Sequence, residues 1–489
     1  MISENVRVRI APSPSGNLHI GTARTALFNF LFAKKNNGKF VLRIEDTDAE
    51  RTSQEYVDNI FDSLKALGLN WDEGPDVGGE YGPYTQSQRF DIYPKYVQEL
   101  LDKGFAYECF CTPEELEAEK ELATKNKQAY VYSKKCENLT EEEKEKLRKE
   151  GRKPAIRFNI AKAQKAFHSN SILEFDDLVK GKLHVDTNLI GDFVIMKSNG
   201  SPTYNFAVVI DDALMKISHV IRGEDHISNT YKQILIFEAL GFEVPKFGHL
   251  GMILAPDRSK LSKRHGATAV SDFVKEGYLT EALINFVALL GWAPSDGEEI
   301  KPVDKIAEDF RIGEISSSNS IFEYDKLKWM NGQYINKMDL AKLTDLALPF
   351  LNMYDLNKYT RSQLEKIIEI TREPITLLKD LVYDTQYFFE KPDYAEVKEL
   401  LNSELSKDVL NEFSKEVQTY DFNNSEELHE KLADFRARFK EVKGYKPKET
   451  MWAIRAAVTG RTRGADMVAI LELLGKDETI KRIEASRNA

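Results

Sequence analysis

A histidine and a glycine near the start of the chain stand where a strand turns into a helix, a place suited to binding phosphate. His19 and Gly21 follow the β-branched run 6–10 and a turn broken by two prolines and a glycine. Over residues 22–35 the apolar side chains recur at helical spacing. A histidine just ahead of a helix N-terminus can donate to a phosphate oxygen without a full charge, and glycine lets the backbone approach closely. The pattern predicts a nucleotide site at His19.

A basic run far along the chain is the second candidate for binding phosphate. It reads Lys-Leu-Ser-Lys-Arg-His-Gly over residues 260–266. Alone, such a run is usually an exposed loop. Paired with His19 it points to chemistry at a phosphate, because mobile lysines can close on negative charge that develops in the transition state.

Acidic and basic side chains at one edge of the predicted sheet suit an amino acid. Arg9 lies near the end of the first strand, and Glu45 follows the second. A carboxylate can hold an amino group, and a buried arginine can hold a carboxylate through two hydrogen bonds. Tyr204 and Arg222 are expected at the same edge. Two arginines for one ligand indicate a ligand with two carboxylates.

The three cysteines fall in one stretch, as Cys109, Cys111 and Cys136. Three soft ligands suit zinc, but a structural zinc site has four. Tyr132 is a candidate for the fourth. The pattern leaves two interpretations open, a zinc site or three ordinary thiols.

The elements that position these residues begin with a βαβ unit. Strands are predicted at 6–10 and 40–44, with the helix 22–35 between them and ended by Gly38. Asn199-Gly200 predicts a hairpin that joins strands 193–196 and 204–207. Further predicted strands and helices are the strands 208–212, 217–222 and 251–254 and the helices 53–67, 87–101, 112–122, 140–149, 228–240 and 281–291.

The predicted fold class is α/β, a Rossmann-like parallel-sheet catalytic domain with an α+β insertion, followed by an all-α C-terminal half. The expected domains are residues 1–106 and 198–260 for the two halves of the Rossmann-type domain, 107–197 for the insertion, 261–340 for a helical domain with the lysine loop, and 341–489 for the C-terminal half.

Composition excludes several classes of protein. The chain has 489 residues, 42% of them hydrophobic, and no apolar run long enough to span a membrane, so we expect a soluble protein without membrane insertion or secretion. Three cysteines in a chain of this length fit a reducing cytoplasm. The net charge of -11 disfavours a general nucleic-acid binder but not a local basic surface, such as the cluster between Arg436 and Arg463.

Taken together, the motifs resemble those of class I aminoacyl-tRNA synthetases, specifically the bacterial glutamyl-tRNA synthetases. The likeness spans nearly the whole chain, and its order and spacing are specific. Thr22 stands where most class I enzymes have a second histidine, and Ser15 replaces a usual threonine. The segments that carry the likeness are 12–21, 43–48, Tyr204, 222–226 and 260–264.

The resemblance implies a two-step reaction with ATP and Mg²⁺. The α-carboxylate of L-glutamate attacks the α-phosphorus of ATP, which gives glutamyl-adenylate and pyrophosphate. The glutamyl group then passes to a ribose hydroxyl at the 3′ end of tRNA(Glu). The family also implies that tRNA is needed for efficient activation, and we expect a monomer.

The resemblance also implies a role for each candidate residue. Glu45 is expected on the amino group of glutamate and Lys263 as the main cation of the transition state. The glutamate-binding set is Arg9, Ala11, Ser13, Glu45, Tyr204 and Arg222. The ATP-binding set is His19, Gly21, Asp225 and Lys263, and the catalytic set is His19, Thr22, Lys260 and Lys263.

The other parts of the chain also match parts of these enzymes. The insertion resembles the domain that binds the tRNA acceptor end, which in some members carries structural Zn²⁺ through CxC and YxxxC residues, here Cys109, Cys111, Tyr132 and Cys136. The C-terminal half resembles their helical anticodon-binding domain. Three alternatives are a glutaminyl-tRNA synthetase, a glutamyl-queuosine enzyme and a non-catalytic tRNA-binding relative.

Overall fold

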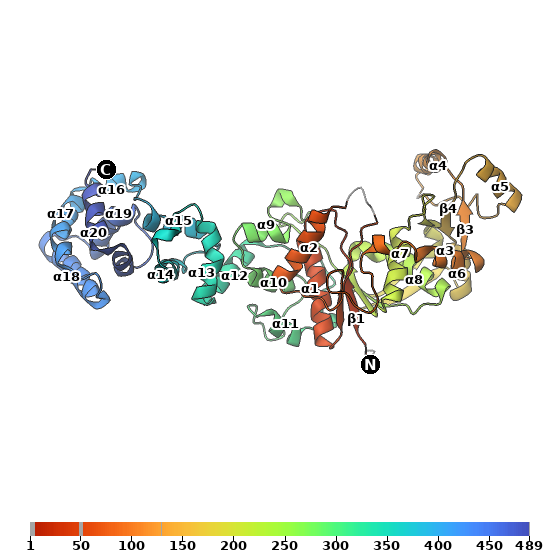
Figure 1. Cartoon of the computed structure of the whole chain (residues 1–489), viewed down its shortest axis with the longest axis horizontal. Helices are drawn as coiled ribbons and strands as arrows, with labels where there is room; N and C mark the ends of the chain where they lie inside the picture. The colour runs from red at the N-terminus through yellow and green to blue at the C-terminus, as the bar shows by residue number, and fades with distance from the viewer. Residues whose placement is uncertain (1–4, 48–51, 129, 489) are drawn as a thin grey trace. The chain divides into compact units, whose positions relative to one another are not determined.

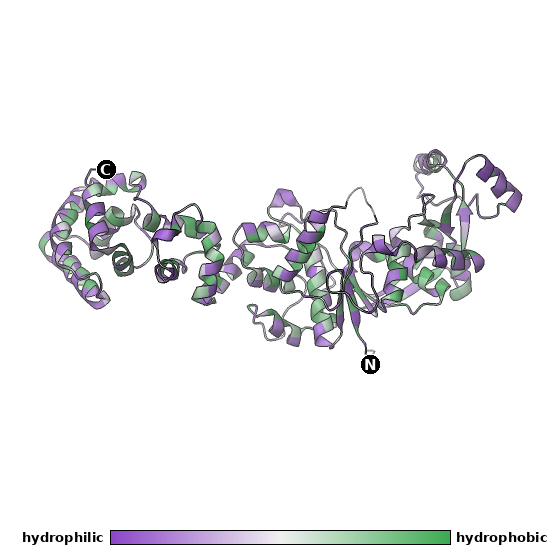
Figure 2. Cartoon of the chain, viewed as in Figure 1, coloured by the Kyte–Doolittle hydropathy of each residue, from purple (hydrophilic) through white to green (hydrophobic). Residues whose placement is uncertain are grey.

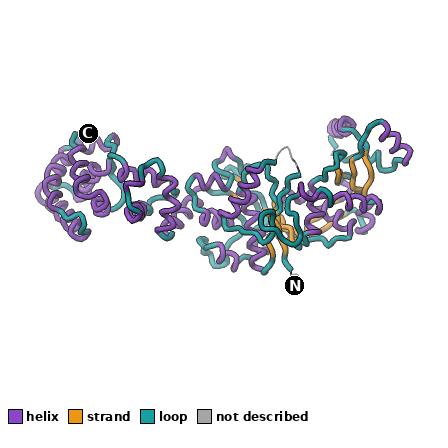
Figure 3. The backbone as a smooth tube through the Cα atoms, in the orientation of Figure 1, coloured by secondary structure: helices purple, strands orange, loops and turns teal. Residues whose placement is uncertain are grey.

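The computed structural model describes residues 5–47, 52–128 and 130–488, which form two compact units (Figure 1). The first unit comprises Met1–Val274 and Leu283–Glu323, and the second comprises Lys275–Ala282 and Tyr324–Ala489. Within the described residues, strands occur only in the first unit, whereas the second consists of helices and loops (Figure 3). None of the helices in these ranges is long and apolar enough to cross a bilayer.

The predicted βαβ unit is confirmed. Strand β1 (Arg7–Ile10) pairs in parallel with β2 (Lys39–Leu42), and α1 (Ile20–Lys35) connects them. The helix ends at Lys35 as predicted, and Asn37 rather than Gly38 takes the left-handed conformation, with φ 49°. Gly38 serves a close approach instead, because a Cβ there would lie 2.3 Å from the carbonyl oxygen of Val6.

A second sheet continues beside β1. Its strand order is β6-β5-β9-β8, and β5, β9 and β8 are parallel. The backbone N–H of Ser218, just before β8, donates to the carbonyl oxygen of Arg7 at 3.0 Å. The bounds are β5 (Ile172–Asp177), β6 (Gly181–Asp186), β8 (His219–Gly223) and β9 (Lys246–Leu250).

The hairpin predicted around Asn199-Gly200 is half correct. The turn forms, with Gly200 at φ 84°. The chain then enters helix α7 (Tyr204–Leu214) instead of the predicted strands 204–207 and 208–212. An uninterrupted apolar run such as 206–210 is compatible with a strand or with a helix buried on all sides, and here every residue of that run is buried.

The predicted insertion contains helices and an antiparallel sheet of order β3-β4-β7. A capping box of Thr140 and Glu143 opens α5. The predicted helix 87–101 is divided into a short 3-10 turn and α3. The elements of this region are β3 (Ala106–Cys109), α4 (Pro113–Lys125), α5 (Glu141–Lys149), β4 (Ala155–Phe158), α6 (Ile160–Phe167) and β7 (Phe193–Met196). Three helices outside the insertion are α2 (Gln54–Ala66), α3 (Tyr93–Asp102) and α8 (Ile227–Leu240).

The remaining part of the first unit includes a pair of short parallel strands, β10 (Ile253–Leu254) and β11 (Ser320–Ile321), the second of which was not predicted. The helices of this region are α9 (Val270–Lys275), α10 (Thr280–Ala288) and α11 (Val303–Asp309), and α9 and α10 contain residues of both units.

The helices of the second unit each bury one face. Phe413, Phe435 and Leu471 belong to its core, and hydrophobic and hydrophilic residues alternate along these helices in Figure 2. The bounds are α12 (Tyr324–Lys337), α13 (Leu340–Ala347), α14 (Arg361–Thr371), α15 (Asp380–Phe389), α16 (Lys398–Leu401), α17 (Glu404–Glu416), α18 (Ser425–Lys443), α19 (Pro447–Thr459) and α20 (Met467–Ser486).

Candidate active site

A cavity of about 670 Å³ opens at the carboxyl ends of the parallel strands, where α/β sheets bind their ligands. It brings together all but one of the residues predicted to bind glutamate or ATP or to act in catalysis. The exception is Lys263, which is exposed in a 3-10 turn and does not line the cavity. The predicted residues that line it are Arg9, Ala11, Ser13, His19, Gly21, Thr22, Glu45, Tyr204, Arg222, Asp225 and Lys260.

His19 caps the N-terminus of α1. Its Nδ1 accepts a hydrogen bond from the backbone N–H of Gly21 at 3.1 Å. Burial, together with the charge of Lys260, lowers the pKa of His19. The neutral imidazole that accepts at Nδ1 carries its proton on Nε2. His19 therefore offers an Nε2–H donor at a helix end that already favours anions.

The lysine loop is tied to the His19 turn at one end. The backbone N–H of Ile20 donates to the carbonyl oxygen of Thr268 at 2.8 Å, and Val270 donates to Leu18 at 3.0 Å. At its other end, Lys260 forms a β-bridge with Leu254. The two motifs paired by sequence reasoning are therefore hydrogen-bonded neighbours, although 249 residues separate His19 from Thr268.

Arg9 and Arg43 share one buried carboxylate. Arg43 Nη1 donates to Asp212 Oδ1 at 2.7 Å, and Arg9 Nε lies 3.2 Å from the same oxygen. Burial alone would raise the pKa of Asp212, but the two guanidinium groups outweigh it and lower the pKa. Arg43 also donates to Glu45 at 2.9 Å, and burial raises the pKa of Glu45 despite that contact.

Asp211 belongs to a second buried pair next to this one. Its carboxylate accepts hydrogen bonds from Arg89 Nε at 2.6 Å, from Gln86 at 2.9 Å and from the Tyr93 hydroxyl at 3.0 Å. Sequence reasoning missed Asp211 and Asp212 as members of the site. Two adjacent acids at the end of a fully apolar run were the available signal, because buried acids need charged partners.

Arg222 is buried among neutral groups. Its Nε donates to His249 Nε2 at 3.3 Å, and its Nη2 donates to Thr230 at 2.7 Å and to Gln233 at 2.8 Å. Its Nη1 reaches the Tyr204 hydroxyl at 3.5 Å, the limit for a hydrogen bond. In the part of the chain that the structure describes, Arg222 forms no ion pair with a carboxylate. Burial lowers its pKa.

Arg222 therefore leaves one positive charge at the cavity that no carboxylate of the described residues pairs with. Arg9 is paired with Asp212, and Arg43 with Asp212 and Glu45. An unpaired buried charge is costly unless a ligand neutralises it. A ligand with two carboxylates and one ammonium group carries the required single negative charge.

Comparison with known proteins identifies the family. Residues 5–329 match the model for the catalytic domain of class I tRNA synthetases (E and Q), and residues 342–487 match an anticodon binding domain. A glutamate–tRNA ligase of Carboxydothermus hydrogenoformans is 46% identical, over 98% of this chain and 99% of its own length. A Caldicellulosiruptor saccharolyticus relative of the same name is 46% identical, over 98% of each chain. The chain belongs to the glutamate–tRNA ligase family.

Solved structures agree with this assignment. The crystal structure of a glutamate–tRNA ligase from Elizabethkingia meningosepticum in complex with its amino acid has a TM-score of 0.88, at 34% identity over 99% of both chains. The enzyme from Elizabethkingia anophelis has a TM-score of 0.85, at 34% identity over 99% of this chain and 100% of that one. The predicted fold class and the predicted family, an aminoacyl-tRNA synthetase, are thus confirmed.

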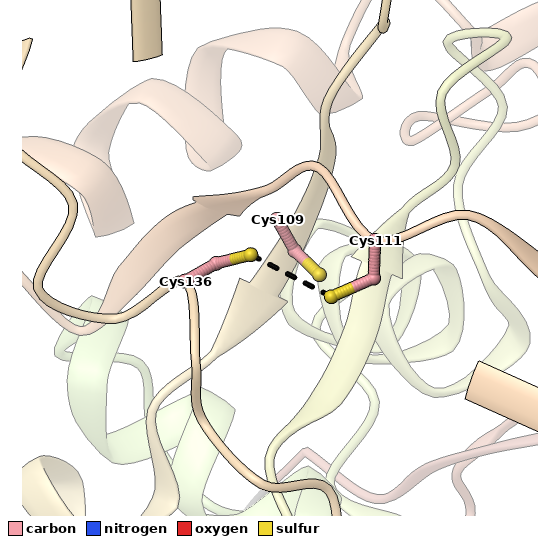
Figure 4. Close-up of side chains that lie close together, drawn as sticks. All are labelled: Cys109, Cys111 and Cys136. Atoms are coloured by element: carbon pink, nitrogen blue, oxygen red, sulfur yellow. Dashed lines mark hydrogen bonds between the residues drawn. The ribbon is translucent and has the colours of Figure 1, made fainter. Parts of the chain in front are cut away.

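This member of the glutamate–tRNA ligase family has its three cysteines in one cluster. Their sulfur atoms lie within 4.8 Å of one another and point toward a common centre (Figure 4). The Tyr132 hydroxyl is 3.3 Å from the sulfur of Cys109 and 3.2 Å from that of Cys111. Arg157 donates to the sulfur of Cys109 at 3.2 Å. A hydrogen bond from Cys136 is the main cause that lowers the pKa of Cys109, to about 4.

The C-terminal basic cluster of this glutamate–tRNA ligase family member does not form one unpaired surface. Arg438 is paired with Glu416, and Lys443 with Asp408. Arg455 donates to a backbone carbonyl instead. Arg461 lies over the ring of Tyr383 at 3.5 Å. A strand of RNA would therefore meet a mixture of paired charges and aromatic faces on this unit.

Proposed function

We propose that this chain activates L-glutamate with ATP and transfers the glutamyl group to the 3′ end of tRNA(Glu). The observation that carries the substrate is the Arg222 guanidinium, which lines the cavity without a carboxylate partner among the described residues, since glutamate has a net charge of −1 at pH 7 and glutamine is neutral. This proposal favours glutamate over the glutaminyl alternative without further assumptions about the pocket.

The amino acid binds between Arg9 and Arg222. Arg222 Nη1 has two N–H donors and one weak contact, so it is the part of this guanidinium that is available to a carboxylate. Glu45 accepts from the ammonium group, and Arg9 supplies the second cation. Tyr204, Ser13 and the backbone at Ala11 complete the glutamate site.

ATP binds with its phosphates at the start of α1. His19, Gly21, Thr22, Lys260 and Asp225 all line the cavity, and we assign these groups to ATP. Lys263 has to move to reach the phosphates, which suits a cation that acts in the transition state. Magnesium would arrive with the ATP phosphates, because the described residues contain no cluster of three carboxylate or histidine ligands at the cavity.

The tRNA spans other parts of the chain. We assign its acceptor end to the insertion at 107–197 and its anticodon to the helices after residue 340, which include the matched anticodon binding domain. A monomeric enzyme of the cytoplasm is the form we expect to act.

Zinc is assigned to Cys109, Cys111, Cys136 and Tyr132. Three thiols supply the soft ligands that a structural zinc takes, and the Tyr132 hydroxyl, 3.3 Å from the sulfur of Cys109, is the fourth ligand that we propose. Arg157 fits such a site, because three thiolates around one zinc ion leave excess negative charge beside it. The ion would fix this part of the insertion. Elemental analysis tests this proposal, with a Cys136→Ser variant expected to lose the metal.

Amino-acid-dependent exchange of pyrophosphate into ATP, measured with tRNA present, tests the main proposal. Glutamate should support exchange and glutamine should not. Lys263→Ala should lower turnover by roughly tenfold or more, with little change in tRNA affinity. A preference for glutamine would overturn the substrate, and unchanged turnover in the variant would overturn the role of Lys263.

A further inference from the structure

Two buried residues form a chain behind Arg222, on the side away from Tyr204. His249 Nδ1 lies 2.6 Å from Asp177 Oδ2, and both side chains are fully buried. On its other side, His249 Nε2 accepts from Arg222 Nε at 3.3 Å. The order is therefore carboxylate, imidazole, guanidinium. Asp177 ends β5 and His249 lies in β9, so the chain joins two neighbouring strands.

Asp177 is held in place by several backbone groups. Its Oδ1 accepts from the N–H groups of Val179 at 2.9 Å, Lys180 at 2.8 Å and His249 at 3.1 Å. These bonds leave Oδ2 for the imidazole. Together with the His249 imidazole they lower the pKa of Asp177, although burial opposes them. Asp177 is thus an ionised acceptor with a fixed direction.

The acceptor decides which nitrogen of His249 carries the proton. A carboxylate beside Nδ1 requires a proton there, so Nε2 of the neutral ring presents a lone pair. That lone pair faces Arg222 Nε–H. Burial lowers the pKa of His249, which keeps the ring neutral and its Nε2 free to accept. The opposite tautomer would set an N–H donor against Arg222 Nε–H and could donate only toward the Thr230 hydroxyl, which lies 3.0 Å from Nε2.

The imidazole also acts as a spacer. Arg9 is held by direct contact with the Asp212 carboxylate, which offsets part of its charge because Arg43 shares that carboxylate. Arg222 is oriented just as firmly by His249, Thr230 and Gln233, but the nearest charge in this chain of contacts, on Asp177, is one ring away. Arg222 keeps a fixed direction and an uncompensated charge at the same time. A carboxylate in direct contact would also have fixed the direction of Arg222, but it would have compensated the charge.

We propose that Asp177 and His249 are positioning residues that aim Arg222 at the substrate carboxylate and leave its charge available. This inference rests on the proposed role of Arg222 in binding glutamate. Neither residue touches the substrate, and neither lines the cavity.

The test compares variants of the full chain in pyrophosphate exchange with tRNA present, with KM for glutamate, KM for ATP and kcat measured for each. Asp177→Asn keeps an oxygen for the three backbone donors but turns an amide N–H toward His249 Nδ1, which forces the wrong tautomer. Loss of a hydrogen bond to a charged group should raise KM for glutamate roughly tenfold or more, with KM for ATP and kcat nearly unchanged.

Two variants of His249 separate position from packing. His249→Gln retains an acceptor for Arg222 Nε–H and should stay close to wild type in KM for glutamate. His249→Leu has no acceptor and should raise that KM about as much as Asp177→Asn, by roughly tenfold. Glu238→Gln is the matched control, because Glu238 lies on the same helix as Thr230 and forms another carboxylate–histidine pair, with His168 at 2.9 Å. Glu238→Gln should leave KM for glutamate, KM for ATP and kcat unchanged.

The outcomes distinguish this inference from the proposed function. Equal KM values for glutamate in His249→Gln and His249→Leu would overturn the positioning role, as would a rise in KM for ATP that matches the rise for glutamate. Arg222→Lys should raise KM for glutamate; if it does not, the assignment of Arg222 fails as well. If Asp177→Asn melts far below wild type, the two His249 variants still decide between the outcomes.

Discussion

Arg43 and Arg222 lie in the same unit and are both almost completely buried, but the groups around them are of opposite kinds. Arg43 is surrounded by carboxylates, those of Glu45, Asp211 and Asp212. Arg222 is surrounded by a histidine, a threonine, a glutamine and a tyrosine, all neutral. The charge of Arg43 is matched by carboxylates of the chain, whereas Arg222 has no carboxylate partner among the described residues.

The difference separates a structural charge from a functional one. Removing Arg43 would leave carboxylates buried without their main partner, whereas removing Arg222 would leave only neutral groups. Removal of Arg43 should therefore lower the free energy of unfolding, whereas removal of Arg222 should weaken the binding of glutamate. The following experiments test that contrast, from the largest expected effect to the smallest.

Arg43→Met should lower the free energy of unfolding by about 3–5 kcal/mol, because it leaves Asp212 and Glu45 as buried carboxylates with too few cations. Urea unfolding at pH 7 measures the change. Arg148→Met is the control, since Arg148 pairs with Glu108 on the surface and its loss should change the free energy of unfolding far less. Similar losses in the two variants would contradict the structural role of Arg43.

Arg222→Met should lower kcat/KM for glutamate by roughly a hundredfold or more, because the substrate carboxylate loses a charged donor. The same variant should lose no more than about 2 kcal/mol of stability, since only neutral partners are left unpaired. Exchange kinetics and urea unfolding of one preparation give both values. A loss of stability as large as that of Arg43→Met would erase the contrast.

Lowering the pH should reduce the stability of the protein through His226, which feels the charge of Arg222, before it breaks the ion pairs of Arg43. Burial, and then the charge of Arg222, lower the pKa of His226 to about 4. The unfolded chain binds a proton at this histidine near pH 6.5, where the folded chain does not, so the stabilising contribution is complete above that pH and declines as the pH falls toward 4. The pKa of Asp212 is lowered, so its ion pairs persist through this range.

Urea unfolding at pH 7 and pH 5 measures this effect. The loss of stability on acidification should be smaller in His226→Gln than in wild type, by about 1 kcal/mol. An equal loss in both proteins would show that His226 does not titrate as the structure implies.

The smallest expected effect is on the titration of His226 itself. If Arg222 is uncompensated, Arg222→Met should raise the pKa of His226 above its value of about 4, because a like charge is removed. NMR titration of histidine-labelled protein follows the ring directly. Arg148→Met should leave this pKa unchanged, and an unchanged value in Arg222→Met would mean that the charge of Arg222 is already neutralised.

Local sequence patterns predicted the site residues that stand at the end of a strand or at the start of a helix. The helical spacing after His19, and the position of Arg9 and Arg222 at strand ends, were enough to place these residues at the cavity. These positions follow from periodicity and from the geometry of parallel sheets.

Long-range pairing was beyond the sequence. Asp177 and His249 are 72 residues apart, and only the pairing of β5 with β9 brings them together. Asp211 and Asp212 were taken for the end of a strand because the apolar run before them fits either kind of element. Lys263 remains a prediction, since the loop that carries it lies outside the cavity.

The hairpin β5–β6 sets a limit on how the enzyme can be simplified. It lies within the predicted insertion at 107–197, yet β5 pairs with β9, and the N–H of Leu178 donates to Phe247 at 2.8 Å. Excision of the whole segment, to obtain a minimal adenylate-forming fragment, would remove Asp177 along with it. A shortened enzyme that is to keep its preference for an acidic amino acid must retain Ile172–Asp186, whatever else is trimmed.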